Sequence, residues 1–209
     1  MLKHWKKLST EIIKQNPWWT YKKDIFQIPE KEQQGEYHYV HTEGASLIIP
    51  VTNDGKIILV KQYRYLCDRE SIEFPCGGVK INSTYQKTAQ QELEEETGYS
   101  AKFFQEIGEF NPYNGVTNEI CKIFLAKNLQ KVISKPDVTE EFEILYCTFS
   151  EIEVMIQQQK IWEFHLHRAE AHKNQYQYHE KQKFSKYCYD LLRERKQWLA
   201  YSTLQVSLA

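Results

Sequence analysis

The segment from Gly77 to Gly98 limits the fold of this chain more than any other part of the sequence. It begins with paired glycines, which let a backbone approach another group closely. Asn82, Ser83 and Thr84 are candidate N-caps of a helix, and Ser83 with Gln86, three residues later, fits a capping box. Gly98 is a typical helix stop. Two apolar residues would dock this helix onto the rest of the protein, Ala89 and Leu93. The pattern predicts one helix between a glycine turn and a glycine stop.

Three carboxylates of this predicted helix fall on one face. Glu92, Glu95 and Glu96 occupy positions i, i+3 and i+4, and no basic residue lies within a turn on that face. Like charges at this spacing destabilise a helix by about 0.2–0.5 kcal/mol per pair, so a compensating cation is expected. Carboxylate oxygens suit Mg²⁺, and Mn²⁺ as an alternative. The competing interpretation is a solvated acidic face, which the flanking glycines at fixed spacing disfavour.

The same segment resembles the Nudix box, G-x5-E-x7-R-E-U-x-E-E-x-G-U, in which U is a bulky apolar residue. The matching positions are Gly77, Glu92, Leu93, Glu95, Glu96, Gly98 and Tyr99. Ser83 stands where the family has glutamate, and Gln91 stands where it has arginine. In the family this pair orients the metal-binding carboxylates. The resemblance therefore implies an altered support, in which a neutral hydrogen bond between Ser83 and Gln91 replaces a charged pair.

The resemblance extends to the ADP-ribose pyrophosphatase branch of the Nudix family. It rests on the stretches 48–51, 59–65, 69–70 and 73–78, and on residues 111–119, which stand where the branch has a substrate loop. The implied fold is an α/β/α sandwich with a mixed sheet and an N-terminal β-extension that forms a homodimer. The implied parts are residues 1–43 for dimerisation, 44–160 for the Nudix domain and 161–209 for a C-terminal helical segment.

The resemblance also assigns roles to single residues. Metal ligands would be Glu92, Glu95, Glu96 and the backbone carbonyl of Cys76, and the three glutamates would also be catalytic. Substrate contacts would come from Arg64, Arg69, Glu73, Asn114 and Gly115. Arg64 suits a phosphate because its planar fork binds two oxygens, whereas the alternative is a surface salt bridge.

A general base is also needed to activate water. Glu140 and Glu141 are the candidates, since a loop before the last strand supplies this base in the branch. The alternatives are an acidic loop in solvent, or a base drawn from the box glutamates, as in other family members. The base ring of a nucleotide would stack on an aromatic side chain, but the sequence does not separate the candidates, Trp18, Trp19, Tyr37 and Tyr39.

The implied reaction is metal-dependent hydrolysis of the pyrophosphate bond of a nucleoside diphosphate sugar. ADP-ribose is favoured and would give AMP and ribose 5-phosphate, while GDP-mannose or another nucleoside diphosphate derivative is the alternative substrate. From a different class, the chain would be a Nudix-like sensor that binds such nucleotides without hydrolysis. Ser83 and Gln91 favour the sensor, and retention of the three box glutamates opposes it.

Apolar and turn patterns predict the remaining elements. Residues 3–14 would form a helix that buries Trp5, Leu8, Ile12 and Ile13, and residues 18–28 and 37–42 would form a hairpin. Further strands are expected at 45–52 and 57–65, joined by an Asn-Asp-Gly turn, and at 101–109, 119–126 and 142–149. A helix is expected over 151–159, with a capping box from Ser150 and Glu153, and another around 184–192.

Composition narrows the function classes. The net charge is −1, which gives no reason to expect binding to nucleic acid or membranes. Five scattered cysteines without C-x-x-C spacing indicate free thiols in a reducing, cytoplasmic compartment. The histidines at 165, 167, 172 and 179 match no zinc pattern. The aromatic N-terminal strands are interpreted as an interface, with an ordinary core as the alternative.

Overall fold

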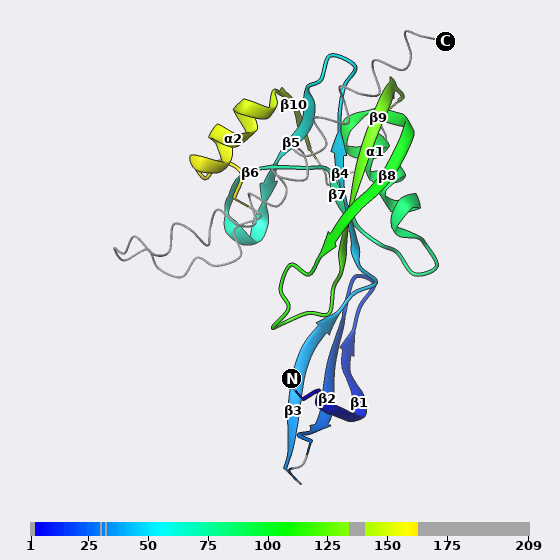
Figure 1. Cartoon of the computed structure of the whole chain (residues 1–209), viewed down its shortest axis with the longest axis vertical. Helices are drawn as coiled ribbons and strands as arrows, with labels where there is room; N and C mark the ends of the chain where they lie inside the picture. The colour runs from blue at the N-terminus through cyan, green and yellow to red at the C-terminus, as the bar shows by residue number, and fades with distance from the viewer. Residues whose placement is uncertain (1–2, 30, 32, 134–140, 163–209) are drawn as a thin grey trace. The chain divides into compact units, whose positions relative to one another are not determined.

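The computed structural model describes residues 3–29, 31, 33–133 and 141–162 of the chain (Figure 1). The chain divides into two compact units, Met1–Phe149 and Ser150–Ala209. The described residues of the first unit form three sheets, one α-helix and a short 3-10 helix. In the described residues, no helix has the length and apolar character needed to cross a membrane.

A four-stranded sheet forms the centre of the first unit, with the order β7-β4-β9-β8. Its strands are β4 (Ala45–Pro50), β7 (Cys76–Gly78), β8 (Tyr99–Phe110) and β9 (Cys121–Lys131). Strands β4 and β9 run parallel, whereas β7 and β8 pair antiparallel with their neighbours. The sheet is therefore mixed, as the sequence predicts.

A second sheet has the order β10-β5-β6 and is antiparallel throughout. It contains β5 (Ile57–Arg64), β6 (Arg69–Glu73) and β10 (Glu143–Cys147), with the short 3-10 helix η1 (Tyr65–Cys67) at the β5–β6 turn. The predicted Asn-Asp-Gly turn forms, with Gly55 at φ 82°. The two predicted strands that it joins, β4 and β5, belong to different sheets.

Helix α1 (Tyr85–Thr97) lies against the central sheet (Figure 1). Its Ala89 and Leu93 are fully buried with Ile48, Phe124 and Ala126 in the core, so the predicted apolar stripe is confirmed. Burial of a leucine side chain contributes about 1.5–3 kcal/mol. This packing also fixes the direction of the neighbouring acidic side of the helix, where Glu96 is itself buried.

The ends of α1 show two confirmed predictions and one wrong one. Gly98 closes the helix at φ 69°, with its amide bonded to the carbonyl of Glu94. Thr84, one of the three predicted N-caps, caps the helix. The predicted Ser83–Gln86 capping box is therefore wrong. Thr84 has extended φ and ψ, and its hydroxyl accepts a hydrogen bond from the amide of Lys87 at 3.2 Å. A threonine one residue later supplies the same cap chemistry.

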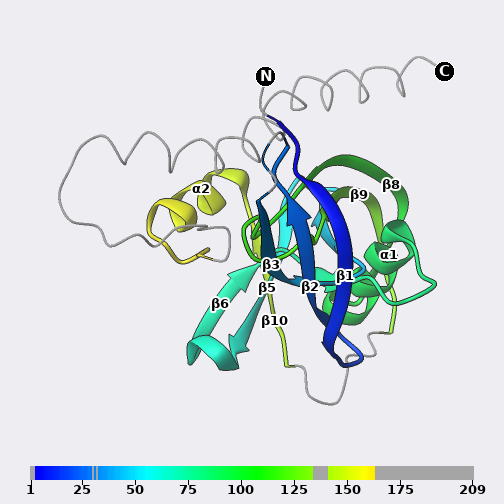
Figure 2. The ribbon, with the colours of Figure 1, turned by 90° about the horizontal axis from the view of Figure 1, so that it is seen from below.

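The N-terminal part is a three-stranded antiparallel sheet of β1 (Lys6–Gln15), β2 (Thr20–Gln27) and β3 (Gln34–His41), which lie side by side in Figure 2. The predicted hairpin of residues 18–28 and 37–42 is confirmed. The predicted helix over 3–14 is wrong, because most of those residues belong to strand β1. Two register shifts, at Leu8 and Ile13, explain the error, because each bulge inserts a residue and breaks the alternation that marks a strand.

Helix α2 spans Phe149–Gln157. The expected helix in this region is confirmed, but it begins earlier than predicted. Ser150 therefore lies inside the first turn and does not occupy the N-cap, so the predicted Ser150–Glu153 capping box is wrong. The predicted helix at residues 184–192 and the four histidines from 165 to 179 lie outside the described residues.

Candidate functional site

The contact between Gly77 and Glu92 defines the centre of the predicted metal site. A Cβ atom added to Gly77 would lie 2.1 Å from Cδ and 2.2 Å from Oε1 of Glu92. No side chain larger than hydrogen fits there while the glutamate keeps its position. The glycine thus lets β7 approach the acidic face of α1, and the Glu92 carboxylate lies directly over the β7 backbone.

The neighbouring turn of α1 contacts the same strand. The amide of Cys76 donates a hydrogen bond to Oε2 of Glu96 at 3.2 Å, and Glu96 is only 6% exposed. Glu95 is half-buried. Because Glu92 and Glu96 contact adjacent residues of β7, the structure brings two of the three predicted carboxylates and the predicted backbone ligand Cys76 together.

The donor set fits a magnesium ion that binds together with a substrate. Across the described parts of the chain, no three His, Cys, Asp or Glu side chains converge into a complete metal cage. Mg²⁺ does not require such a cage, since it keeps several waters and binds through one or two carboxylates and substrate phosphates. A tetrahedral zinc site would need ligands of a different kind.

Ser83 and Gln91, the positions that depart from the Nudix pattern, do not support each other. The hydroxyl of Ser83 lies 3.4 Å from that of Thr88, and Gln91 is exposed. The predicted hydrogen bond between Ser83 and Gln91 is therefore wrong. In this chain Glu92 and Glu96 both contact β7 directly, which restricts their carboxylates.

Arg64 forms a two-pronged ion pair with a buried carboxylate. Its Nε donates to Oε1 of Glu73 at 2.8 Å, and its Nη2 donates to Oε2. Gln62 Nε2 also donates to Oε2, at 3.1 Å. The Glu73 side chain is 1% exposed and the Arg64 side chain 39%. Glu73 thus orients a guanidinium that keeps one side accessible, which differs from a salt bridge between two exposed groups.

Arg69 lies directly across the β5–β6 hairpin from Arg64 and is exposed. Like charges at directly opposed positions of an antiparallel pair are unfavourable without a counter-charge. Both arginines also make other interactions.

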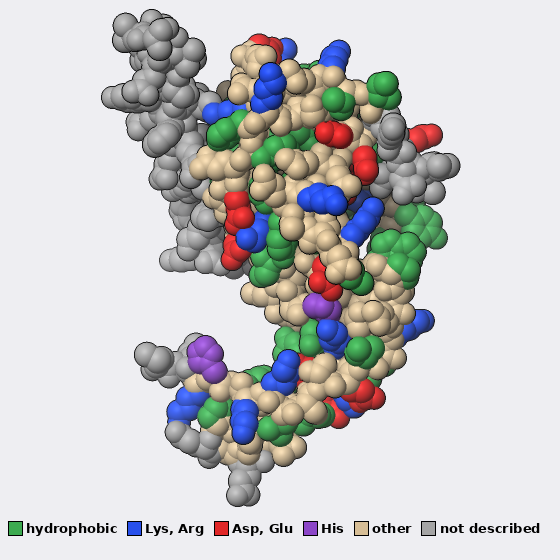
Figure 3. All heavy atoms as spheres, turned by 90° about the vertical axis from the view of Figure 1, so that its right-hand side faces the viewer, with side chains coloured by type: hydrophobic (Ala, Val, Ile, Leu, Met, Phe, Trp, Pro, Cys, Tyr) green, Lys and Arg blue, Asp and Glu red, His purple; other side chains and the backbone are tan. Residues whose placement is uncertain are grey.

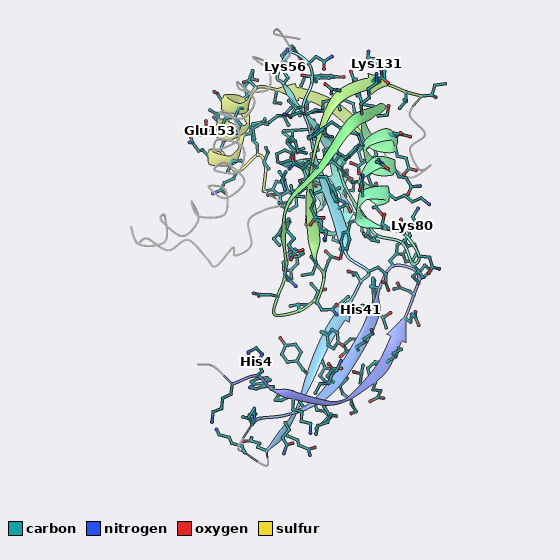
Figure 4. All side chains as sticks on the ribbon, turned by 45° about the vertical axis from the view of Figure 1, so that its right-hand side comes forward. His4, His41, Lys56, Lys80, Lys131 and Glu153 are labelled. Carbon is teal, nitrogen blue, oxygen red and sulfur yellow. The ribbon has the colours of Figure 1, made fainter. Side chains whose placement is uncertain are left out.

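The predicted substrate loop is exposed at its tip. Asn114 and Gly115 lie in a turn open to solvent, and a Cβ atom at Gly115 would meet nothing within 4 Å. The loop contacts β3, where the Tyr37 hydroxyl donates to the carbonyl of Gly115 at 3.0 Å. Figure 4 shows His41, at the end of β3, where this sheet joins the rest of the unit.

Only one of the two candidates for the general base lies in the described residues. Glu141 is exposed just before β10, and Glu140 lies outside the described residues. The assignment of either residue as the base stays a prediction.

Two contributors to the site were missed from the sequence. Gln62 and Arg64 both donate hydrogen bonds to Glu73. The sequence could have indicated this, because residues two apart in a strand lie on the same face. Tyr85 fixes the start of α1 to β4, because its carbonyl accepts a hydrogen bond from Ser46 at 2.8 Å. Burial raises the pKa of the Tyr85 hydroxyl. A Cβ atom at Gly44 would lie 2.3 Å from that hydroxyl oxygen.

Comparison with known proteins identifies relatives of this chain. A model of the NUDIX domain matches residues 40–170. The chain is 34% identical over 122 residues to "ADP-ribose pyrophosphatase" of Bacillus subtilis (strain 168), a match that covers 57% of this chain and 66% of that protein. It is 29% identical over 133 residues to "Methanol dehydrogenase activator" of Bacillus methanolicus, covering 63% of this chain and 72% of the relative.

A solved structure shares the fold. "Crystal structure of ADP compounds hydrolase" superposes with a TM-score of 0.66 at 16% identity, covering 78% of this chain and 92% of the other. The predicted α/β Nudix fold is thereby confirmed. The family model matches more than half of the chain, so the chain belongs to the NUDIX domain family.

Proposed function

We propose that this Nudix hydrolase cleaves the pyrophosphate bond of a nucleoside diphosphate sugar in a reaction that requires Mg²⁺, with Mn²⁺ as an alternative ion. The preferred substrate is ADP-ribose, and the products are AMP and ribose 5-phosphate. The observation that carries the proposal is the contact of α1 with β7, where Glu92 lies over Gly77 and Glu96 accepts a hydrogen bond from the Cys76 amide. This contact supports the proposal because it brings two carboxylates close to the backbone of β7.

Some residues of the site would bind the metal ion, and others would bind the substrate. Glu92, Glu95, Glu96 and the carbonyl of Cys76 would hold the ion. When bound, Mg²⁺ offsets negative charge on the diphosphate oxygens and favours attack by water.

The substrate phosphates would be bound by arginine. Arg64, held in a fixed orientation by Glu73, would bind a phosphate through its accessible side, and Arg69 would add charge from the opposite strand. Asn114 and Gly115 would contact the substrate from the 111–119 loop. Glu141 or Glu140 would accept a proton from the attacking water.

The choice of ADP-ribose rests on the relatives. Two of them, from Bacillus subtilis (strain 168) and Mycobacterium tuberculosis (strain ATCC 25618 / H37Rv), are named "ADP-ribose pyrophosphatase". The relative from Streptomyces rubellomurinus (strain ATCC 31215) is named for hydrolysis of a CMP-phosphonate. The nucleotide thus varies among relatives, so the substrate needs a direct assay.

The test is turnover of a panel of nucleotides with Mg²⁺, read as phosphate release after phosphatase coupling. The panel contains ADP-ribose, GDP-mannose and a cytidine diphosphate derivative, and EDTA provides the metal-free control. Glu95→Gln and Glu96→Gln should each reduce turnover by orders of magnitude while the fold survives, since glutamine keeps an oxygen for the Cys76 amide. Mg²⁺-dependent activity close to wild type in both variants would disprove the metal site. Tight binding of ADP-ribose without turnover would favour the sensor.

We also propose that the β1–β3 sheet forms the interface of a homodimer. All residues of β1 are exposed, and apolar side chains appear on the surface of this sheet in Figure 3. The most exposed are Trp5 at 54%, Ile12 at 59% and Trp18 at 79%. A second copy would bury this surface with one self-complementary patch.

Light scattering tests this interface directly. The full chain should be a dimer at micromolar concentration, and Ile12→Lys should produce a monomer. A monomeric wild-type chain would disprove the interface. Deletion of residues 1–42 is a poorer test, because it also removes the β3 contacts of the 111–119 loop.

A cytoplasmic location is part of the same proposal. Four cysteines in the described residues, Cys67, Cys76, Cys121 and Cys147, are free thiols. Free thiols are typical of proteins in reducing compartments.

A further inference from the structure

The main chain of β3 pairs with the 111–119 loop inside the same protomer. The amide of Val40 donates to the carbonyl of Val116 at 2.9 Å, and the amide of Asn118 donates to the carbonyl of Val40 at 3.3 Å. The ring nitrogen Nδ1 of His41 is 3.1 Å from Oδ1 of Asn118. The C-terminal half of the loop is therefore registered on β3 as a short piece of parallel sheet.

Two side chains extend this contact in both directions along the loop. At its end, the Thr42 hydroxyl donates to Oε2 of Glu119 at 2.7 Å. At its tip, the Tyr37 hydroxyl donates to the carbonyl of Gly115 at 3.0 Å. The tip contact joins residues 78 positions apart in the sequence, so it depends entirely on the placement of β3.

The loop also has internal hydrogen bonds that make it compact. Asn111 accepts a hydrogen bond from the amide of Tyr113 at 2.9 Å and donates to the carbonyl of Thr117 at 3.2 Å. The carbonyl of Tyr113 accepts from the amides of Val116 and Thr117, at 2.8 and 2.9 Å. These bonds close a turn with Asn114 and Gly115 at its exposed tip. They leave the Gly115 carbonyl for Tyr37.

We propose that Tyr37 is a positioning residue for substrate binding, which sets the tip of the 111–119 loop from within its own protomer. This inference rests on the proposed function, in which Asn114 and Gly115 contact the substrate. Tyr37 does not itself need to touch the substrate, since it acts through the Gly115 carbonyl. The N-terminal sheet thus has a role in the substrate site that is separate from dimer formation.

The geometry favours positioning over simple stabilisation of the fold. The side chain of Tyr37 is 40% exposed, so its ring contributes little to a buried core. Gly115 is exposed, with open space where a side chain would be. A hydrogen bond from a half-exposed tyrosine to an exposed turn orders that turn more than it stabilises the whole unit.

The test compares Tyr37→Phe with Tyr21→Phe. Both changes remove one hydroxyl from the N-terminal sheet and keep the ring, but the Tyr21 hydroxyl bonds to His38 Nδ1 at 2.8 Å and not to the loop. Tyr37→Phe should raise the KM for ADP-ribose by about 2- to 10-fold while kcat and the oligomeric state stay unchanged. Amide hydrogen exchange in a peptide that covers the loop should become faster. Tyr21→Phe should change neither KM nor this exchange.

The possible results distinguish a failure of the Tyr37 positioning role from a failure of the proposed hydrolase activity. Unchanged KM in Tyr37→Phe would overturn the positioning role, whether or not exchange in the loop becomes faster. An equal rise of KM in Tyr21→Phe would also overturn it, because the effect would then be a general one of the sheet. A wild-type chain that turns over no nucleotide would refute the proposed function, and hydrogen exchange would still decide whether Tyr37 orders the loop.

Discussion

The replacement of Gly77 by alanine tests the predicted metal site most directly. The added Cβ atom would lie 2.1 Å from Cδ of Glu92. Ordinary contact between carbon atoms needs about 3.5 Å, so the carboxylate must move by about 1.4 Å. A displacement of about 1 Å in a positioned group can reduce turnover about 100-fold. We therefore expect Gly77→Ala to reduce kcat/KM by about two orders of magnitude.

The fold should tolerate this change. The atoms in the way belong to the end of a flexible glutamate side chain, and an unfavourable rotamer costs about 0.5–1.5 kcal/mol. The lower entropy of alanine in the unfolded chain offsets about 0.4–1 kcal/mol. The net loss of stability is then below about 1 kcal/mol, or about 2–4 °C in Tm for a chain of this size. Loss of activity should far exceed loss of stability.

Gly78→Ala is the matched control, because a Cβ atom on Gly78 meets nothing within 4 Å. It should keep wild-type activity and Tm.

A double-mutant cycle adds a second criterion. Gly77→Ala should reduce kcat/KM only slightly in a chain that already carries Glu92→Gln, since both changes disable the same carboxylate. The reasoning would be refuted by a folded Gly77→Ala variant with kcat/KM within a few-fold of wild type. Full additivity with Glu92→Gln would refute it as well.

Three further predictions concern the ion pair, the substrate loop and a tyrosine pair. Arg64→Met should destabilise the protein by about 1.5–3 kcal/mol in chemical denaturation, since Glu73 loses its charged partner. Adding Glu73→Leu should recover stability but not kcat/KM. Gly115→Ala should leave Tm unchanged but raise the KM for ADP-ribose if the substrate approaches the loop backbone, and an unchanged KM would argue against that contact. The hydrogen bond with Tyr99 raises the pKa of Tyr146 to about 12 from its ordinary value of 10.0. As pH rises, the unfolded chain therefore loses this proton before the folded chain does. The denaturant concentration at the unfolding midpoint should decrease as pH rises from about 10 to 12, and this decrease should be smaller in Tyr146→Phe.

The box helix was predictable because several independent signals agree on it. Glycines at both ends, the apolar pair Ala89 and Leu93, and the acidic face each specify the same helix, and the structure uses all of them. The sequence offered Asn82, Ser83 and Thr84 as chemically equivalent N-caps, and only the backbone conformation selects Thr84. Local signals thus specified the element but not its first residue.

The N-terminal strand and the ion-pair network were not predictable in the same way. The apolar residues of β1 follow helical spacing because bulges at Leu8 and Ile13 shift the strand register, and pairing with β2 overrides that local pattern. The bond between Arg64 and Glu73 depends on the register of β5 with β6, which no local pattern specifies. Tertiary pairing decided both features.

The structure also explains how this chain manages without the glutamate and arginine that the Nudix pattern places at positions 83 and 91. A charged pair at those positions would orient the carboxylates from the helix side. Here Glu96 accepts a hydrogen bond from the Cys76 amide, and Glu92 is confined by the closeness of Gly77. Both constraints come from β7, a strand whose position is set by pairing with β4 in the central sheet. Because that sheet is built around a buried core, the packing of the whole unit contributes to the orientation of the carboxylates.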